Sequence, residues 1–375
     1  MNPVLSLWEI IATFIYVPTD LIIQWFSDSF NTFVDILRHL PQYTMEFLAV
    51  NAKPILQITL LPGLAWVIVY AIIAVWFERK FLARAMLRVG PYYCGGRAGW
   101  LQLIADFIKL FFKEMIIPRD VNWLFFVAMP VLLPSVPALA VILIPFDTHW
   151  VLWDAGGLGL PIFFAIAGLA PLIPIFTGWA SKNKYTFIGA WRVAYLYISA
   201  EIPMVICGAA VAIMAGSFNL VDIVEAQQSM WFFVPQFIGF AIFFLGVFIQ
   251  SERTPFDIPG AETELVLGWR TEYSGVLYGF VMFTEYVMLQ AWALLFLTLY
   301  MGGYNGPVLF GMATASHIFW LVLKFVLLVT LVILCRVVYP RLRIDQMLKL
   351  GWYYLTPLAV LNLIVTLALK LWGVY

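Results

Sequence analysis

Long apolar segments recur along this chain, and they constrain its fold more than any other feature. A segment of about 20 apolar residues can cross the hydrocarbon core of a bilayer as a helix. Only 11% of the 375 residues are charged, whereas soluble domains carry about 25%. The chain is therefore predicted to be an all-α integral membrane protein. Eight spans are expected, at residues 56–77, 121–144, 159–180, 189–214, 231–250, 276–300, 312–338 and 352–373.

The first 50 residues are apolar, but Pro18 and several aspartates interrupt them. They lack the basic start and clean apolar stretch of a cleaved signal peptide. Two alternatives remain, a ninth span near residues 4–26 or an amphipathic helix on the membrane surface, and the surface helix is favoured. We expect residues 1–50 to form an N-terminal extension and residues 51–375 to form a single membrane domain.

Positive charge lies in alternate loops, and this sets the predicted orientation. Most of the 21 basic residues lie in the segments 78–119, 181–192, 251–274 and 336–349. Lysine and arginine do not occur in the loops 145–158, 215–230 and 301–311. Loops rich in Lys and Arg remain in the cytoplasm, so the first set is predicted to face it. The alternation also supports the span count, because a missed span would place basic loops on both sides.

Cysteine and histidine are too scattered to predict a metal centre. Cys94, Cys207 and Cys335 form no CxxC pair, which argues against an iron–sulfur cluster or structural zinc. His317 falls near the start of a predicted span, but the sequence offers it no evident partner for haem. If the chain belongs to an electron-transfer complex, the redox centres of that complex are therefore expected in other subunits. The formal net charge is zero, so the sequence does not indicate nucleic-acid binding.

The segment 100–116 predicts a short amphipathic helix. Gln102, Asp106, Lys109 and Lys113 recur at helical spacing on one face, and apolar residues cover the rest. Such a helix is too short and too charged to span a bilayer. It is either a membrane-surface anchor, which the sequence alone favours, or one wall of an apolar chamber that admits a lipid-soluble substrate.

The loop 251–275 concentrates acidic residues. It is either a solvated loop or a loop packed against protein, and interleaved apolar residues such as Phe256 and Trp269 favour packing. Clustered carboxylates raise one another's pKa and can exchange protons near neutral pH. The charged residues are Glu252, Asp257, Glu262, Glu264 and Glu272, with Arg253 and Arg270 beside them.

Three ionisable residues lie inside predicted spans: Glu201, Glu285 and Lys324. An ionisable group in hydrocarbon costs several kcal/mol unless it meets a partner or water. Two explanations remain open at this point, a structural ion pair within the bundle and a proton relay.

Together, these segments resemble the quinone-site membrane subunit of respiratory complex I, the NADH-quinone oxidoreductase of bacteria and mitochondria. The resemblance runs from about residue 56 to 373, and its motifs are specific in combination. They are Glu78-Arg79-Lys80 with Arg88-Val89-Gly90-Pro91, the helix from Leu101 to Glu114, WASKNKY at 179–185 followed by Arg192 and Glu201-Ile202-Pro203, the loop from Arg253 to Gly275, and the stretch from Arg336 to Gln346.

This resemblance implies a subunit, without a redox centre of its own, of a proton-translocating quinone oxidoreductase of the respiratory chain. Quinone would be the substrate, and the iron–sulfur clusters would lie in soluble partner subunits on the cytoplasmic face. Small membrane subunits and antiporter-like subunits would adjoin it in the lipid bilayer. The expected location is the plasma (cell inner) membrane, with multiple spans.

The resemblance also assigns individual residues, and no metal ligand is among them. The proton path would use Glu201, Glu285, Asp257, Glu262, Glu264, Glu272 and Lys324. The quinone chamber and its loop would use Glu78, Arg79, Arg88, Asp106, Lys109, Arg192, Arg253, Phe256 and Tyr273.

The chain departs from the family pattern at several positions. Gln250 replaces a glutamate, Glu252 stands where asparagine is common, Gly260 replaces a frequent glutamate, and Tyr92 replaces an asparagine. Glu252 would compensate for the missing charge, though not in the same place. Position 260 therefore lacks a carboxylate that many relatives use, so the number of relay sites cannot be carried over directly from the family. The loop and the extended N-terminus resemble archaeal more than bacterial members.

Two other functions are compatible with parts of the sequence. One is the homologous membrane subunit of an energy-converting hydrogenase, which shares the ancestral loop but lacks a quinone tunnel. Nickel-ligand cysteine pairs in a partner subunit would identify it, and the amphipathic helix argues mildly against it. The other is a stand-alone secondary transporter with a midplane substrate site, which the dense acidic loop argues against.

Overall fold

The computed structural model describes residues 63–372, apart from residues 97, 149, 152–154, 259, 261 and 309–312 and the side chains at 155, 262, 263 and 313. These residues all belong to one compact unit, Gln57–Tyr375. The predicted N-terminal extension, with its helix near 4–26, lies outside the described residues. Within them, regular structure is helical, apart from one isolated bridge between Asp147 and Trp150.

Among the described residues, six helical segments are long and apolar enough to cross a membrane. The prediction of an all-α membrane protein is thereby confirmed. Three of the segments are continuous: α9 (Lys184–Ala215), α13 (Gly275–Tyr300) and α14 (Ala313–Val338). The other three are interrupted: α5 (Trp123–Leu132) with α6 (Ser135–Ile142), α7 (Gly159–Ala167) with α8 (Leu172–Ala180), and α15 (Ile344–Lys349) with the π-helix Leu350–Leu355 and α16 (Thr356–Leu371).

The two remaining predicted spans differ from these six. The span expected at 231–250 is the shorter helix α11 (Phe237–Gln250), which begins after Pro235. The span expected to end at residue 77 is α3 (Leu64–Ala85), which continues through a charged stretch. Lys, Arg and Glu are good helix formers, so the helix does not end where the apolar segment ends.

Proline explains two of the interruptions. Pro134 directly precedes α6, and Pro171 directly precedes α8. Proline has no backbone N–H and clashes with the preceding turn, so it ends or kinks a helix. The unbroken α9 is capped at both ends. At its start, the side chain of Asn183 accepts a hydrogen bond from the Tyr185 N–H. At its end, Gly216 terminates the helix with a φ of 79°. A left-handed glycine is a common helix terminator.

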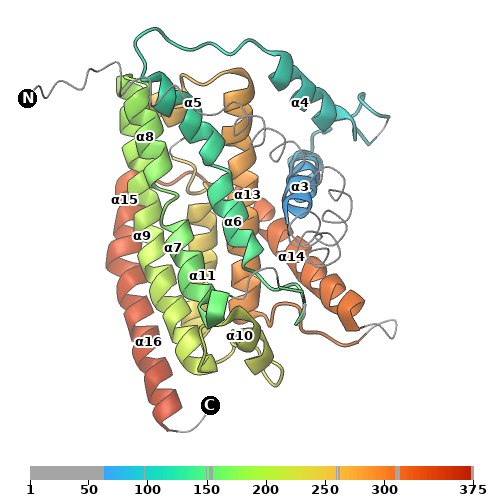
Figure 1. The fold of residues 1–375 in the computed structure, drawn as a ribbon, viewed down its shortest axis with the longest axis vertical. Coiled ribbons are helices and arrows are strands. Elements are labelled where there is room, and N and C mark those ends of the chain that lie inside the picture. Colours follow the sequence, from blue (N-terminus) through green and yellow to red (C-terminus); the bar gives the residue numbers. More distant parts are fainter. Residues whose placement is uncertain are drawn as a thin grey trace, which may run out of the picture. The chain divides into compact units, whose positions relative to one another are not determined.

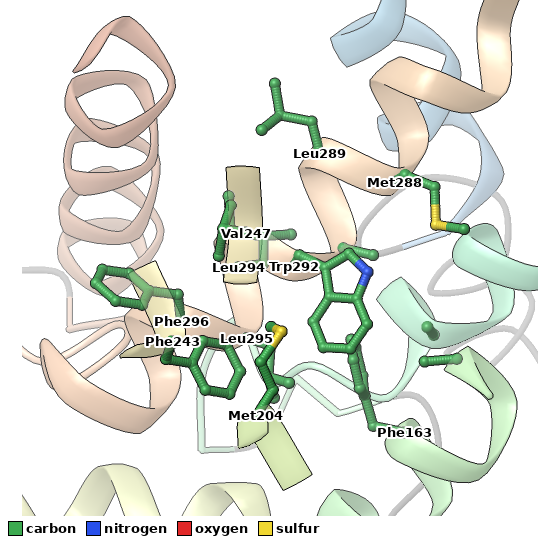
Figure 2. Packing of buried hydrophobic residues seen from close by; sticks show 14 of the residues in the cluster. Phe163, Met204, Phe243, Val247, Met288, Leu289, Trp292, Leu294, Leu295 and Phe296 are labelled. Carbon is green, nitrogen blue, oxygen red and sulfur yellow. The ribbon is translucent and has the colours of Figure 1, made fainter. Parts of the chain in front are cut away.

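Helices α9 and α13 each pack against several helices of the described unit, and α9 runs beside α8 and α16 (Figure 1). Helix α9 packs against α8, α11 and α16, whereas α13 packs against α6, α11 and α14. Figure 2 shows the apolar core between them, in which the Trp292 ring lies edge-on to Phe163 at 5.4 Å. Gly246 lets α11 approach α9, because a Cβ at this position would lie 2.3 Å from the Met204 sulfur.

The remaining elements are short and connect these helices. They are α4 (Gln102–Phe112), α10 (Leu220–Ala226), α12 (Glu262–Leu265), and the 3₁₀ turns Ala155–Gly157 (η1) and Gly268–Arg270 (η2). Helix α4, the predicted amphipathic helix, packs against α13 and α3. The η2 turn packs against α9 and α8, so the acidic loop is attached to the helix that carries Glu201.

Candidate functional site

The acidic loop is packed against the helical bundle rather than solvated. Phe256, Leu265, Trp269 and Tyr273 are all buried within it. Gly189 of α9 allows this contact, because a Cβ there would lie 2.6 Å from the backbone nitrogen of Trp269. The prediction that this loop packs against protein is therefore confirmed, and the solvated alternative is wrong.

One buried group of charges connects this loop to α13. Arg270 donates hydrogen bonds to two carboxylates, Glu252 in the loop and Glu285 on α13. We call Glu252, Arg270 and Glu285 the inner triad. The hydroxyl of Tyr197 on α9 donates to Glu252 Oε1 at 2.7 Å. The triad therefore joins three elements, with two acidic groups for one basic group.

The electrostatics of the inner triad follow from its burial. Burial raises the pKa of Glu252, and the Arg270 guanidinium opposes that rise. Burial alone would lower the pKa of Arg270, but the carboxylates of Glu285 and Glu252 raise it above its usual value. The guanidinium therefore stays charged, and the acidic side of the triad is where a proton can bind.

A second buried group lies around Glu78 on α3. Glu78 Oε1 accepts a hydrogen bond from Arg253 Nη1 at 2.6 Å and another from Arg336 at the end of α14. The Arg253 guanidinium also lies over the ring of Tyr286, 4.6 Å from its centre. We call Glu78, Arg253 and Arg336 the Glu78 cluster. It has two basic groups for one acidic group, the opposite balance to the inner triad.

The chain passes directly from one cluster to the other. Glu252 and Arg253 are neighbours in sequence, yet the first belongs to the inner triad and the second to the Glu78 cluster. Glu252 adopts a φ of 50°, in the left-handed region that non-glycine residues rarely occupy. Backbone hydrogen bonds to Ile249 and Phe248 hold this turn at the end of α11. Strain of this kind occurs at sites where side-chain direction matters more than local stability.

Three further contacts tie the loop to its surroundings. Asp257 accepts from Arg341 at 3.0 Å, and Glu264 accepts from Arg192 at 2.5 Å. Glu272 accepts from Asn183, the residue that caps α9, at 2.5 Å. Burial raises the pKa of Asp257, and the Arg341 guanidinium opposes that rise.

Glu201 stands apart from these ion pairs. It lies on α9, and its Oε1 is 3.2 Å from the place a Cβ on Gly168 would occupy. Gly168 belongs to the interruption between α7 and α8, where the chain turns before Pro171. The carboxylate therefore faces irregular backbone rather than a regular helix. Irregular backbone at membrane depth is typical of buried or water-lined positions.

Lys324 lies elsewhere, near the end of α13. Its Nζ donates to the carbonyl oxygens of Met301, Gly303 and Asn305 at 2.7–3.0 Å. It also lies 4.8 Å from the centre of the Trp231 ring. These partners are backbone and aromatic groups, and none of them can accept a proton as a relay station would.

The amphipathic helix carries the other predicted chamber residues. Arg79 on α3 pairs with Asp106 on α4, which also accepts from Gln102 at 3.1 Å. Arg88 and Lys109 are exposed. In the part of the chain that the structure describes, no residue of α4 is buried. Its exposed apolar side chains are Ile104, Phe107, Ile108, Phe111 and Phe112.

The structure thus brings together most of the predicted loop residues but not all of the predicted site. Phe256 and Tyr273 belong to the apolar core, and Tyr273 stacks on Phe126 at 4.5 Å. The side chain of Glu262 lies outside the described residues. The role of Arg270 and the contributions of Tyr197 and Tyr286 were missed. Helical spacing places Tyr197 one turn before Glu201 on α9, but it does not reveal the hydrogen bond from Tyr197 to Glu252.

Comparison with known proteins gives consistent matches over most of the chain. A family model described as NADH dehydrogenase matches residues 58–367. A protein of Geobacillus sp. (strain WCH70), the H subunit of an NADH-quinone oxidoreductase, is 39% identical over 327 residues, which cover 86% of this chain and 97% of the relative. A protein of the same name from Bacillus thuringiensis (strain Al Hakam) is 39% identical over 315 residues, covering 84% and 93%. Both organisms are bacteria, so the archaeal resemblance gains no support from them.

Proposed function

Because the chain belongs to the NADH dehydrogenase family, we propose that it is the membrane subunit of a complex I-like oxidoreductase that couples quinone reduction to proton translocation. The subunit would form the quinone chamber together with soluble iron–sulfur partner subunits. Small and antiporter-like membrane subunits would adjoin it in the plasma membrane. The names of its relatives favour a quinone oxidoreductase over an energy-converting hydrogenase.

One observation carries this proposal: the charges of the acidic loop form buried ion pairs with the helices of the bundle. The loop contributes Arg270 to a pair with Glu285 on α13, and Arg253 to a pair with Glu78 on α3. A loop that only covered the bundle would not need charged contacts at this depth, since burying charges costs free energy. Charges that persist in such places indicate a functional path.

Protons would move along carboxylates of this network. Quinone reduction takes up two electrons and two protons, and the electrons would come from iron–sulfur clusters in the partner subunits. In this chain, the loop carboxylates Asp257, Glu262, Glu264 and Glu272 would hold protons near the quinone. Glu285 and Glu201 would hold them deeper in the bundle. Each is a group that can bind and release a proton without a change in the fold.

The quinone would enter past α4. The helix presents an apolar surface that no part of the described chain covers. Just before the start of α4, the ring of Trp100 stacks on that of Trp76 of α3, with 3.9 Å between their centres. Arg79 of α3 pairs with Asp106 of α4. An apolar surface with a few polar groups suits a lipid-soluble substrate with a polar head-group.

The substitution Glu201→Gln in the assembled complex tests the relay. It should abolish proton pumping but leave assembly and iron–sulfur content intact, because glutamine has the shape of glutamate without its proton exchange. Glu225→Gln is the matched control, since Glu225 is an exposed carboxylate on α10, away from the network. Full pumping in the Glu201 variant would remove Glu201 from the path.

The loop needs a separate test. Asp257→Asn should slow quinone reduction, because this carboxylate would lie between the head-group and the deeper relay. Activity is measured with a short-chain quinone in membranes that contain the assembled complex. Unchanged turnover would make Asp257 a structural partner of Arg341. A purified complex that evolves hydrogen and reduces no quinone would replace the proposed function with the hydrogenase alternative.

A further inference from the structure

The inner triad carries one more negative than positive charge, and this surplus is buried. Glu252 and Glu285 share the single guanidinium of Arg270. The exposed fraction of the three side chains is only 3% for Glu252, 9% for Arg270 and 15% for Glu285. A net charge held away from water is unfavourable, and uptake of one proton removes it.

A small cavity adjoins this group. It has room for about one water molecule. The inner triad lines it, together with Tyr197, Gln250 and Thr284. A water molecule at this position would contact the triad and would give a proton a route to its carboxylates.

The surroundings of Glu252 favour its protonated form more than those of a solvated glutamate. Four charged or titratable groups face it: Tyr197 from α9, Arg270 from η2, Glu285 from α13 and, farther off, Asp257 from the loop. Only Arg270 among them is basic, and it also serves Glu285. Burial and the acidic neighbours together raise the pKa of Glu252.

We infer that Glu252 and Glu285 jointly carry one exchangeable proton of the coupling reaction and that Arg270 is the positioning residue between them, an inference that rests on the proposed function. The proton arrives from water in the cavity, binds one carboxylate oxygen, and later leaves to water or to the next carboxylate. Only an O–H bond forms and breaks, and no electron moves. Arg270 stays paired throughout with whichever carboxylate remains ionised.

Gln250 shows where else a carboxylate can serve this cavity. Its Nε2 donates to the backbone oxygen of Tyr197 at 3.2 Å, whereas Glu252 accepts from the hydroxyl of the same tyrosine. Both side chains line the cavity. An exchange of the two residue types, with glutamate at 250 and glutamine at 252, would keep a proton-binding group at the same cavity.

This exchange gives a test in the assembled complex, measured as proton pumping by membrane vesicles with a quinone substrate. Glu252→Gln should assemble, because glutamine can still bond to Tyr197 and Arg270 still has Glu285. Its pumping rate should fall by about 100-fold, the scale of a lost proton-transfer group. The double variant Gln250→Glu with Glu252→Gln should pump faster than Glu252→Gln alone. Glu225→Gln is the control and should pump like the unaltered complex.

The outcomes separate this inference from the function on which it rests. Unaltered pumping in Glu252→Gln overturns the inference. So does a double variant that assembles but pumps no better than the single variant, because the carboxylate would then act by its position. Failure of both variants to assemble makes Glu252 a structural group and also overturns it. If the unaltered complex reduces no quinone, the proposed function itself fails, a result that no comparison among the variants can produce.

Discussion

The buried charges at the two ends of the bundle are satisfied in different ways. At one end, the two carboxylates of the inner triad share one guanidinium. At the other, Asp147 has its own partner, His317 of α14, at 2.6 Å. Burial would raise the pKa of Asp147, but hydrogen bonds from His317 and its other neighbours outweigh it and lower that pKa. The pKa of Glu252, in contrast, is raised.

Lys324, like Asp147, has its own hydrogen-bond partners. Three carbonyl oxygens surround its ammonium group, and they belong to the turn that follows α13. A cation at the C-terminal end of a helix also interacts favourably with the helix dipole. One end of the molecule thus gives each buried charged group its own hydrogen-bond partners, whereas at the other end two carboxylates share one guanidinium. This difference is the reason that we place the proposed proton exchange at the inner triad.

The largest effect should come from Arg270→Met, which removes the one basic group of the inner triad. Two buried carboxylates would then face each other without compensation. Loss of one partner from a buried ion pair destabilises a protein by about 3–5 kcal/mol. We expect the assembled complex to be absent or greatly reduced, as measured by native gel electrophoresis of solubilised membranes. Arg270→Lys should restore part of it, and normal assembly of the methionine variant would show that the triad contributes no stability.

Lys324→Met should produce the next largest effect, and only on stability. It leaves three carbonyl oxygens without their donor, and the one on Gly303 is buried. A buried acceptor left unpaired costs about 1–3 kcal/mol. The thermal inactivation temperature of the complex should therefore fall. The number of protons pumped per quinone by the complex that does assemble should not change. A loss of pumping at normal thermal stability would instead support the relay role that the sequence predicts for Lys324.

Asp147→Asn should have a smaller effect that depends on pH. The pKa of Asp147 is lower in the folded than in the unfolded chain, so its ionised form stabilises the fold above about pH 4, the usual value for aspartate. This contribution disappears as the pH falls toward the lowered pKa. The variant should unfold at a lower temperature than the unaltered protein near pH 6, and the gap should narrow toward pH 3. A gap that does not vary with pH would rule out an ionic contribution.

The sequence predicted the helices well, because apolar length and charge-poor composition determine which segments can cross a membrane. It was less successful where tertiary contacts determine the ends of helices and the partners of side chains. The helix α11 is shorter than its apolar stretch, and α3 runs on through charged residues. The break between α7 and α8 could be anticipated from Pro171. The sequence could not show that Glu201 of α9 faces this break.

The same limit applies to the site. The acidic loop is conspicuous in sequence, so most of its residues were identified. The pairing of Arg270 with two carboxylates was not, since one carboxylate follows α11 and the other lies on α13. Charge spacing along a chain does not indicate which groups meet in space. For Lys324, the sequence revealed an ionisable group inside a span but not that its partners are backbone oxygens.

The smallest effect on stability should come from Asp106→Asn. This substitution removes the exposed ion pair of Asp106 with Arg79, whereas the inner triad is buried. Asp106 and Arg79 are 32% and 47% exposed, and exposed pairs contribute about 0–1 kcal/mol. Assembly and thermal stability should therefore stay within that range. If α4 borders the quinone entrance, the KM for quinone should rise while the iron–sulfur content stays constant, as measured by steady-state kinetics. An unchanged KM, with stability also unchanged, would make α4 a membrane-surface anchor and move the quinone entrance elsewhere.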